Sequence, residues 1–513
     1  ARFTSATTSD SIIDSGFGGS VLGIDIDSGY TGTITQQRNV TITSSGFVQD
    51  DGVFQQGDYG FTMFDGSFAQ NGGTFTTASG GSNSTDRSFT VGASATFISS
   101  STKILLFNGV NTSDNSTFNY PGTFPGTVDL AKGRSETSFT LATGVIARMA
   151  DSSTCASNVV INEGATLHAA NNVLDAFSLI ISGQLFSSST IDLGGSFVLN
   201  ATGEVYFDGS SITIERGYTD NGGTFDETGI TFTFDDSYNA GDDTTFDVGG
   251  VFPGIVRIAK TRGGADFTLA AGSTINLTTN NSTAGALSVY GTLRTGGFTL
   301  TGSSMNVYSG GVLAIYPGQT LTTPNLIAGS TVDYYGPGTY TSIGNYSYKN
   351  IEFSDGTLNL TSNMSVAGNF TNSGAVFNQT SGTVTFTGTA NTITGDNTFN
   401  NLTKSATAAS TLTFAAGDTQ TVSGTLTLTG LDADNRLTLE SSVGTNQWFI
   451  DPQGTRSLNF LSVSDGNSIA SAIVNCYDVD CVDGGNNTKI FFVTPPPTYR
   501  LQGGVRLRGG VRL

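Results

Sequence analysis

The chain has 513 residues, 68 of them glycine, and 21 Lys and Arg against 41 Asp and Glu give it a net charge of −20. Charged residues make up only 12%, too few for long amphipathic helices or coiled coils, and the negative charge argues against a nucleic-acid partner. One His and three Cys exclude a catalytic metal centre built from His and Cys alone. The longest apolar runs are too short for a membrane span, for which about 18 residues are needed.

Short runs with an apolar residue at every second position recur along the chain, and many of them have Ser or Thr between the apolar residues. Examples in chain order are 197–199, 205–207, 212–214, 298–300, 313–315, 384–386, 426–428 and 437–439. Alternation with period two predicts half-buried β-strands, and the Gly, Asn, Asp and Ser clusters between the runs predict tight turns. We therefore predict an all-β protein.

The spacing of the predicted strands favours a parallel β-solenoid, or β-helix. Between residues 285 and 321, very short strands alternate with corners of only a few residues. Such a chain can coil around an axis with roughly 20–25 residues per turn. Tandem β-sandwich domains are the alternative, although their turns are usually spaced more widely.

An internal duplication supports a repetitive array. Residues 117–144 align without a gap with residues 245–272, at an offset of 128 residues, and 398–417 form a looser third copy. Repeats of this kind indicate stacked structural units. We divide the chain into an N-terminal β-rich region (1–115), repeat units (116–243 and 244–340), C-terminal solenoid repeats (341–494) and a terminal segment (495–513).

Three lysines recur with the repeats. Lys132 and Lys260 occupy equivalent positions in the two close copies, and Lys404 falls nearby in the third. We expect solvated lysines at the corners of the turns. The alternative is a covalent Lys–Asn isopeptide link.

Clustered aspartates raise the possibility of Ca²⁺ at the corners, because Ca²⁺ prefers carboxylate and carbonyl oxygens. The spacing of an EF-hand loop is not met, so solvated turns are the competing interpretation, and we expect no other cofactor. The candidate ligands are Asp235, Asp236, Asp242, Asp243, Asp478, Asp480 and Asp483.

The cysteines and the single histidine offer few sites. Cys476 and Cys481 are close enough to close a small disulfide loop, which leaves Cys155 over. His168 has no neighbouring residues that indicate a nucleophile, so we expect it in a turn or on the surface. With 41 acidic residues, close carboxylate pairs arise by composition, and we expect no enzymatic activity.

The C-terminal half resembles a known group of proteins. The run GNFTNSGAVFNQTSGTVTFTGTANTITGDNTFNNLTK (368–404) and the later run WFIDPQGTRSLNFLSVSDGNS (448–468) are similar to secreted bacterial parallel β-helix surface proteins. The resemblance is clearest over 345–492. It implies a β-helical fold, an extracellular or cell-surface location, and an adhesin-like or structural role.

The terminal segment 495–513 has the composition of a docking strand. Three prolines, 495–497, form a stiff spacer, and a strand with one apolar and one cationic face follows it. Such a strand can add to a sheet of another, negatively charged copy of the chain. The assembly residues that we expect are Arg500, Val505, Arg506, Leu507, Arg508, Val511, Arg512 and Leu513.

These observations predict a secreted structural protein that assembles head-to-tail with copies of itself into a filament or surface layer. Heterologous contacts between identical subunits make open filaments unless the rotation closes. A surface adhesin that binds cell-surface glycans is the alternative, and a polysaccharide-active β-helix enzyme is a third possibility.

Overall fold

The computed structural model is built from β-strands. It describes residues 1–6, 9–77, 83–99, 104–107, 115–132, 138–149, 153–209, 211–235, 243–260, 266–277, 281–283, 285–316, 319, 321–470, 474–475 and 480–491. The strands form a parallel β-solenoid of about 20 turns, each of about 21 residues. The predicted fold class is confirmed.

Consecutive turns pair in register. Strand β42 (Thr331–Tyr334) pairs with β45 (Asn350–Phe353), which pairs in turn with β48 (Phe370–Asn372), and each pairing is parallel. All strand pairings within the described residues are parallel, whereas β-sandwiches are built from antiparallel strands. The alternative of tandem sandwiches is therefore wrong.

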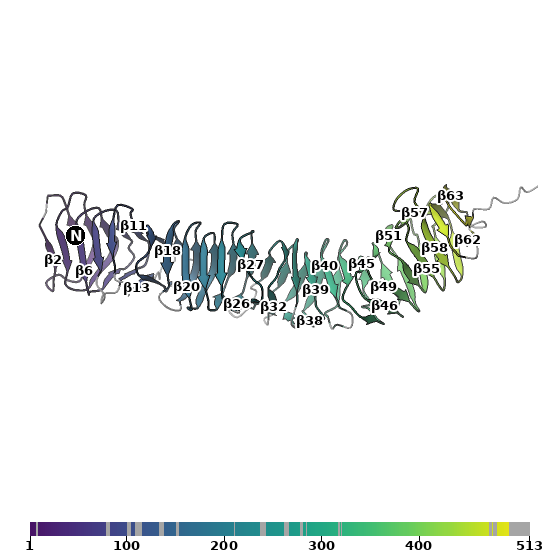
Figure 1. Ribbon diagram of the computed structural model, residues 1–513, viewed down its shortest axis with the longest axis horizontal. Coiled ribbons are helices and arrows are strands. Elements are labelled where there is room, and N and C mark those ends of the chain that lie inside the picture. Colours follow the sequence, from purple (N-terminus) through teal and green to yellow (C-terminus); the bar gives the residue numbers. More distant parts are fainter. Residues whose placement is uncertain are drawn as a thin grey trace, which may run out of the picture. The chain divides into compact units, whose positions relative to one another are not determined.

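Chain contacts divide the solenoid into two compact units. The first comprises Ala1–Asn306 with Thr320–Thr322, and the second comprises Val307–Gln319 with Thr323–Leu513. In each unit, Figure 1 shows strands stacked one turn upon the next. None of the described segments is a helix long and apolar enough to cross a membrane.

Alternating side chains explain the core of the first unit. In β9 (Thr74–Thr77), Phe75 points inward and is 1% exposed, while the threonines on either side of it are half-buried. Phe75 stacks on Phe54 from the turn before, with ring centroids 5.1 Å apart, and on Phe97 from the turn after, at 5.5 Å. Parallel in-register pairing brings like residues over one another, so the core is a column of stacked rings.

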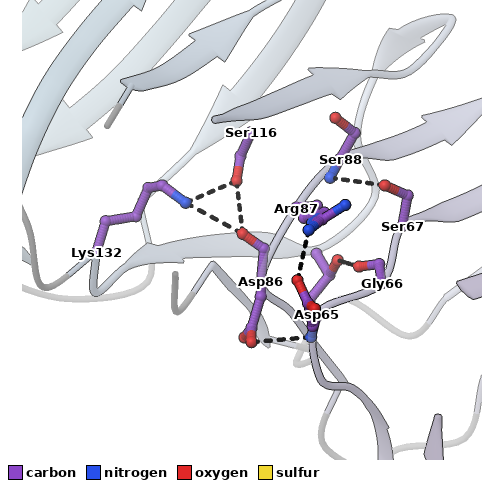
Figure 2. Close-up of polar contacts among 9 residues, drawn as sticks. Asp65, Gly66, Ser67, Asp86, Arg87, Ser88, Ser116 and Lys132 are labelled. Carbon is purple, nitrogen blue, oxygen red and sulfur yellow. Dashed lines mark hydrogen bonds and ion pairs between the residues drawn. The ribbon is translucent and has the colours of Figure 1, made fainter. Parts of the chain in front are cut away.

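The expectation of solvated corner lysines is wrong. Lys132, Lys260 and Lys404 are each at most 1% exposed. Figure 2 shows Lys132 Nζ donating to the Asp86 carbonyl oxygen at 3.1 Å and to Ser116 Oγ at 2.8 Å. Burial is tolerated because the amine finds acceptors at the corner while its alkyl stem packs in the core.

The same cluster recurs one repeat later. Lys260 Nζ donates to the Glu215 carbonyl oxygen at 2.6 Å, and Thr244 Oγ1 donates to that oxygen at 2.7 Å. The second cluster therefore has a counterpart for each residue of the first: Glu215 for Asp86, Thr244 for Ser116 and Lys260 for Lys132. The duplication seen in the sequence extends to a buried polar cluster.

Candidate functional site

Three neighbouring strands of the first unit carry an outward-facing row of rings. The strands are β20 (Thr166–Ala170), β22 (Gln184–Ser187) and β25 (Glu204–Phe207). Their parallel register places His168 beside Phe186 and Phe186 beside Tyr206. His168 is flanked by buried Leu167 and Ala169, Phe186 lies between two buried residues as well, and the residue before Tyr206 is also buried, so the rings lie on the outer face of the sheet.

The three rings stack face to face. The His168 and Phe186 ring centroids are 4.7 Å apart with planes 19° apart, and those of Phe186 and Tyr206 are 4.4 Å apart with planes 6° apart. Tyr206 is 48% exposed at one end of the stack. The in-register pairing of the three strands fixes the positions of the rings, so the stack holds them in one orientation.

A hydrogen-bonded polar ladder runs alongside the rings, two residues earlier in each strand. Thr166 Oγ1 donates to Gln184 Oε1 at 3.1 Å, and Gln184 Nε2 donates to Glu204 Oε2 at 2.7 Å. The Tyr206 hydroxyl donates to the same Glu204 oxygen at 2.9 Å. These two bonds to Glu204, from Gln184 first and Tyr206 second, lower the pKa of its carboxyl, so it is an anion at neutral pH.

The rings form one wall of an open groove of about 450 Å³, which we call the aromatic groove. Its other lining comes from residues next to the rings along the chain and from the next turn. The lining residues are His168, Ala170, Phe186, Ser187, Ser188, Val205, Tyr206, Phe207, Asp208 and Asp226.

A bulge in β20 shapes the groove. The register between β20 and β22 shifts between His168 and Ala170, and Ala170 has a left-handed backbone with φ 51°. The Ala170 carbonyl oxygen accepts hydrogen bonds from the backbone nitrogen of Ser188 at 2.7 Å and from its Oγ at 2.9 Å. Bulges re-aim side chains, and this one ends the regular register of β20 directly after His168.

Charges around the groove are mostly negative. Asp208 and Asp226 are exposed carboxylates, and hydrogen bonds from Thr228 lower the pKa of Asp226. Burial and the charge of Arg148 lower the pKa of His168, so its imidazole is neutral at pH 7. The groove therefore combines an apolar ring wall with carboxylate acceptors.

Two of the predicted calcium ligands, Asp480 and Asp483, make contacts with other residues of the chain. Asp235 and Asp243 are within the described residues, whereas Asp236, Asp242 and Asp478 lie outside them. Asp480 Oδ1 lies 3.4 Å from Arg436 Nη2. Asp483 Oδ1 accepts from the Gly485 backbone nitrogen at 2.9 Å and from Asn487 Nδ2 at 2.7 Å. In the part of the chain that the structure describes, no three His, Cys, Asp or Glu side chains gather to hold a metal.

Other predicted sites fall wholly or partly outside the described residues. Cys481 is disulfide-bonded, and Cys476, its predicted partner, lies outside them. The terminal segment lies outside them too, with its assembly residues Arg500, Val505, Arg506, Leu507, Arg508, Val511, Arg512 and Leu513.

Sequence reasoning missed the aromatic groove. His168 lies in a strand, and the expectation of a surface position agrees with its outward orientation. The available signal was an aromatic residue at two positions, 186 and 206, where the alternation calls for a polar outward residue. These two residues stack only if the turn between them has the right length, and the sequence pattern does not determine the lengths of the turns.

Comparisons of the chain with protein-family models, with curated proteins and with solved structures find no match.

Proposed function

We propose that this chain is an extracellular β-solenoid surface protein that binds glycans in the aromatic groove. The observation that carries the proposal is the outward stack of His168, Phe186 and Tyr206 beside the carboxylates of Asp208 and Asp226. Sugar rings have apolar C–H faces and a rim of hydroxyl donors. Exposed aromatic rings beside hydrogen-bond acceptors match both features.

Size and charge restrict the ligand class. Ligand clefts typically have volumes of about 300–1,000 Å³, and the groove falls within that range. The carboxylates disfavour anionic ligands such as uronate-rich or phosphorylated polymers. We therefore favour neutral or amino-substituted glycans.

Binding of the purified chain to an array of neutral, amino-substituted and acidic glycans tests this proposal, followed by titration of the best ligand. Tyr206→Ala removes the exposed end of the stack and should weaken binding at least tenfold. Tyr59→Ala is a matched control, since Tyr59 is another partly exposed tyrosine, 38% exposed, outside the groove. Absence of glycan binding, or equal affinity in both variants, would contradict the proposal.

The same preparation distinguishes binding from hydrolysis. Release of reducing sugar that is lost in Glu204→Gln or Asp226→Asn would favour a polysaccharide-active enzyme instead. We expect bound glycan to be recovered intact.

Head-to-tail self-assembly is a second proposed function, and the charge pattern favours it. Residues 500–513 contain four arginines, whereas the whole chain has a charge of −20. The described turns pair through parallel strands, so a strand from another copy can extend a sheet with the same kind of hydrogen bonds. Negative-stain microscopy should show filaments, and deletion of 495–513 should abolish them. Filaments that persist after the deletion would overturn docking by this segment.

A further inference from the structure

Lys404 and Asn391 meet inside the second unit, at the corner between two strands. Asn391 points inward from β51 (Ala390–Thr394) and is 2% exposed, and Lys404 points inward from β53 (Asn401–Ser405) and is 1% exposed. Lys404 Nζ lies 2.6 Å from Asn391 Oδ1. Oδ1 is bonded to Cγ, the carbonyl carbon of the amide, so this contact places the amine beside the amide carbonyl group.

The surrounding groups hold the amide in place. Asn391 Nδ2 donates to the carbonyl oxygens of Ala367 at 2.9 Å and of Gly368 at 2.6 Å. These bonds fix the amide plane and direct Oδ1 toward the lysine. Gly388 packs tightly here, because a Cβ at that position would collide with the Ala367 carbonyl oxygen.

Burial increases the neutral fraction of the Lys404 amine. Burial lowers the pKa of Lys404 to about 8, and Leu428 pairs with it in the next turn. Nζ donates to the Gly388 carbonyl oxygen at 2.5 Å and to Asn391 Oδ1, its two hydrogen bonds with the described residues. A neutral amine has two N–H donors, so both are used and the lone pair is left for attack.

We propose that Lys404 and Asn391 form an intramolecular isopeptide bond. The lone pair of Nζ attacks Cγ of Asn391, the new Nζ–Cγ bond forms, and the Cγ–Nδ2 bond breaks. One proton from Nζ passes to the departing nitrogen, which leaves as ammonia. The reaction needs no oxidant or co-reactant, and fixed proximity replaces a bimolecular encounter.

Peptide mapping of the purified full-length chain tests the proposal directly. Residues 350–403 contain no Lys or Arg, so trypsin normally yields the peptides 350–404 and 405–436. An isopeptide bond blocks cleavage after Lys404. We expect a single peptide spanning 350–436, lighter than its sequence mass by about 17 Da, the mass of one ammonia.

Variants identify the residues responsible. K404M keeps an apolar stem of similar length and should abolish the mass loss. K132M is a matched control, since Lys132 is equally buried but donates to a serine hydroxyl and a backbone carbonyl, and it should retain the loss. An intact wild-type mass equal to the sequence mass, with separate peptides 350–404 and 405–436, would overturn the proposal.

Discussion

Phe186 stacks on Tyr206 with ring centroids 4.4 Å apart and planes 6° apart, on the outer face of the solenoid. Stacked rings usually lie in the core of this fold, as Phe54 and Phe75 do at 5.1 Å. Outside the core, the same register creates a ring wall that solvent and ligands can reach. In-register parallel strands align the outward residues of successive turns, so aromatic residues at these positions form one continuous aromatic surface.

Tyr206→Phe separates the ring from its hydroxyl. The ring stack should persist, while Glu204 loses one of the two hydrogen bonds that lower the pKa of its carboxyl. We expect the Glu204 pKa to rise toward its ordinary value, measured by NMR titration of the carboxyl carbon. Gln184→Ala removes the other bond and should raise this pKa further, because the Gln184 bond is the larger cause. An unchanged pKa in both variants would show that these bonds do not form in solution.

His168 should make the stability of the first unit depend on pH. Its folded pKa lies below the ordinary value of 6.5, so the fold favours the neutral imidazole. This contribution is complete above pH 6.5 and is lost as the pH falls through the lower, folded pKa. The melting temperature of the wild type should therefore fall more than that of His168→Phe between pH 7.5 and 5.

The carboxylates titrate in the wild type and in His168→Phe alike. Only the difference between the melting-temperature changes of these two proteins therefore measures the effect of His168. Arg148→Gln serves as a control, because it removes the smaller cause of the shift and should reduce the difference. A wild type and a His168→Phe variant that lose stability in parallel would contradict this assignment.

Asp175 and Asp192 should make the stability of the first unit depend on pH in the opposite direction, with a loss of stability as the pH rises. They pair in register on β21 (Leu174–Ile181) and β23 (Ile191–Leu193), and burial raises the pKa of both, with the charge of Asp192 adding to the effect on Asp175. Their contribution to stability is greatest below the unfolded pKa and is lost as the pH rises through the raised, folded pKa.

Asp192→Asn should therefore raise the melting temperature at pH 7, by roughly 1–3 °C, and change it little near pH 3, where both carboxyls are protonated. Side-chain amides can also hydrogen-bond along such a ladder. Differential scanning calorimetry at the two pH values measures the effect. A lower melting temperature at pH 7 would show that the carboxylate makes a favourable contact.

The alternation of apolar residues with Ser and Thr predicted the strands and their inward faces, because a strand alternates its sides whatever it pairs with. Phe75 and Leu428 are buried as this alternation requires. The pattern also favoured coiling, since very short strands alternate with corners of only a few residues. These features depend on neighbours in the sequence alone.

The buried lysine contacts and the aromatic groove depend on contacts between successive turns, and the turns differ in length. Thr331 pairs with Asn350, 19 residues later, whereas Leu426 pairs with Arg456, 30 residues later. Corner lengths decide which residues of successive turns become neighbours, and the alternation of apolar residues does not fix those lengths. The positions of Lys404 and Tyr206 therefore required the three-dimensional register.

The duplicated lysine clusters predict which substitutions the core accepts. Ser116 and Thr244 occupy equivalent places, and each hydroxyl donates to the backbone carbonyl oxygen that also accepts from the buried lysine. Ser116→Thr should therefore change the local free energy of unfolding by less than about 1 kcal/mol. Ser116→Ala removes an acceptor of Lys132 and should cost about 1–3 kcal/mol.

Hydrogen exchange measured by mass spectrometry resolves this difference, because the stability of a repeat array is local to its turns. Faster exchange in Ser116→Ala should be confined to β14 (Ser116–Asn119), β16 (Thr127–Leu130) and the turns next to them. Exchange at the second cluster, around Thr244 and Lys260, serves as an internal control in the same molecule. Equal exchange in Ser116→Thr and Ser116→Ala would mean that the hydroxyl contributes nothing to the local stability.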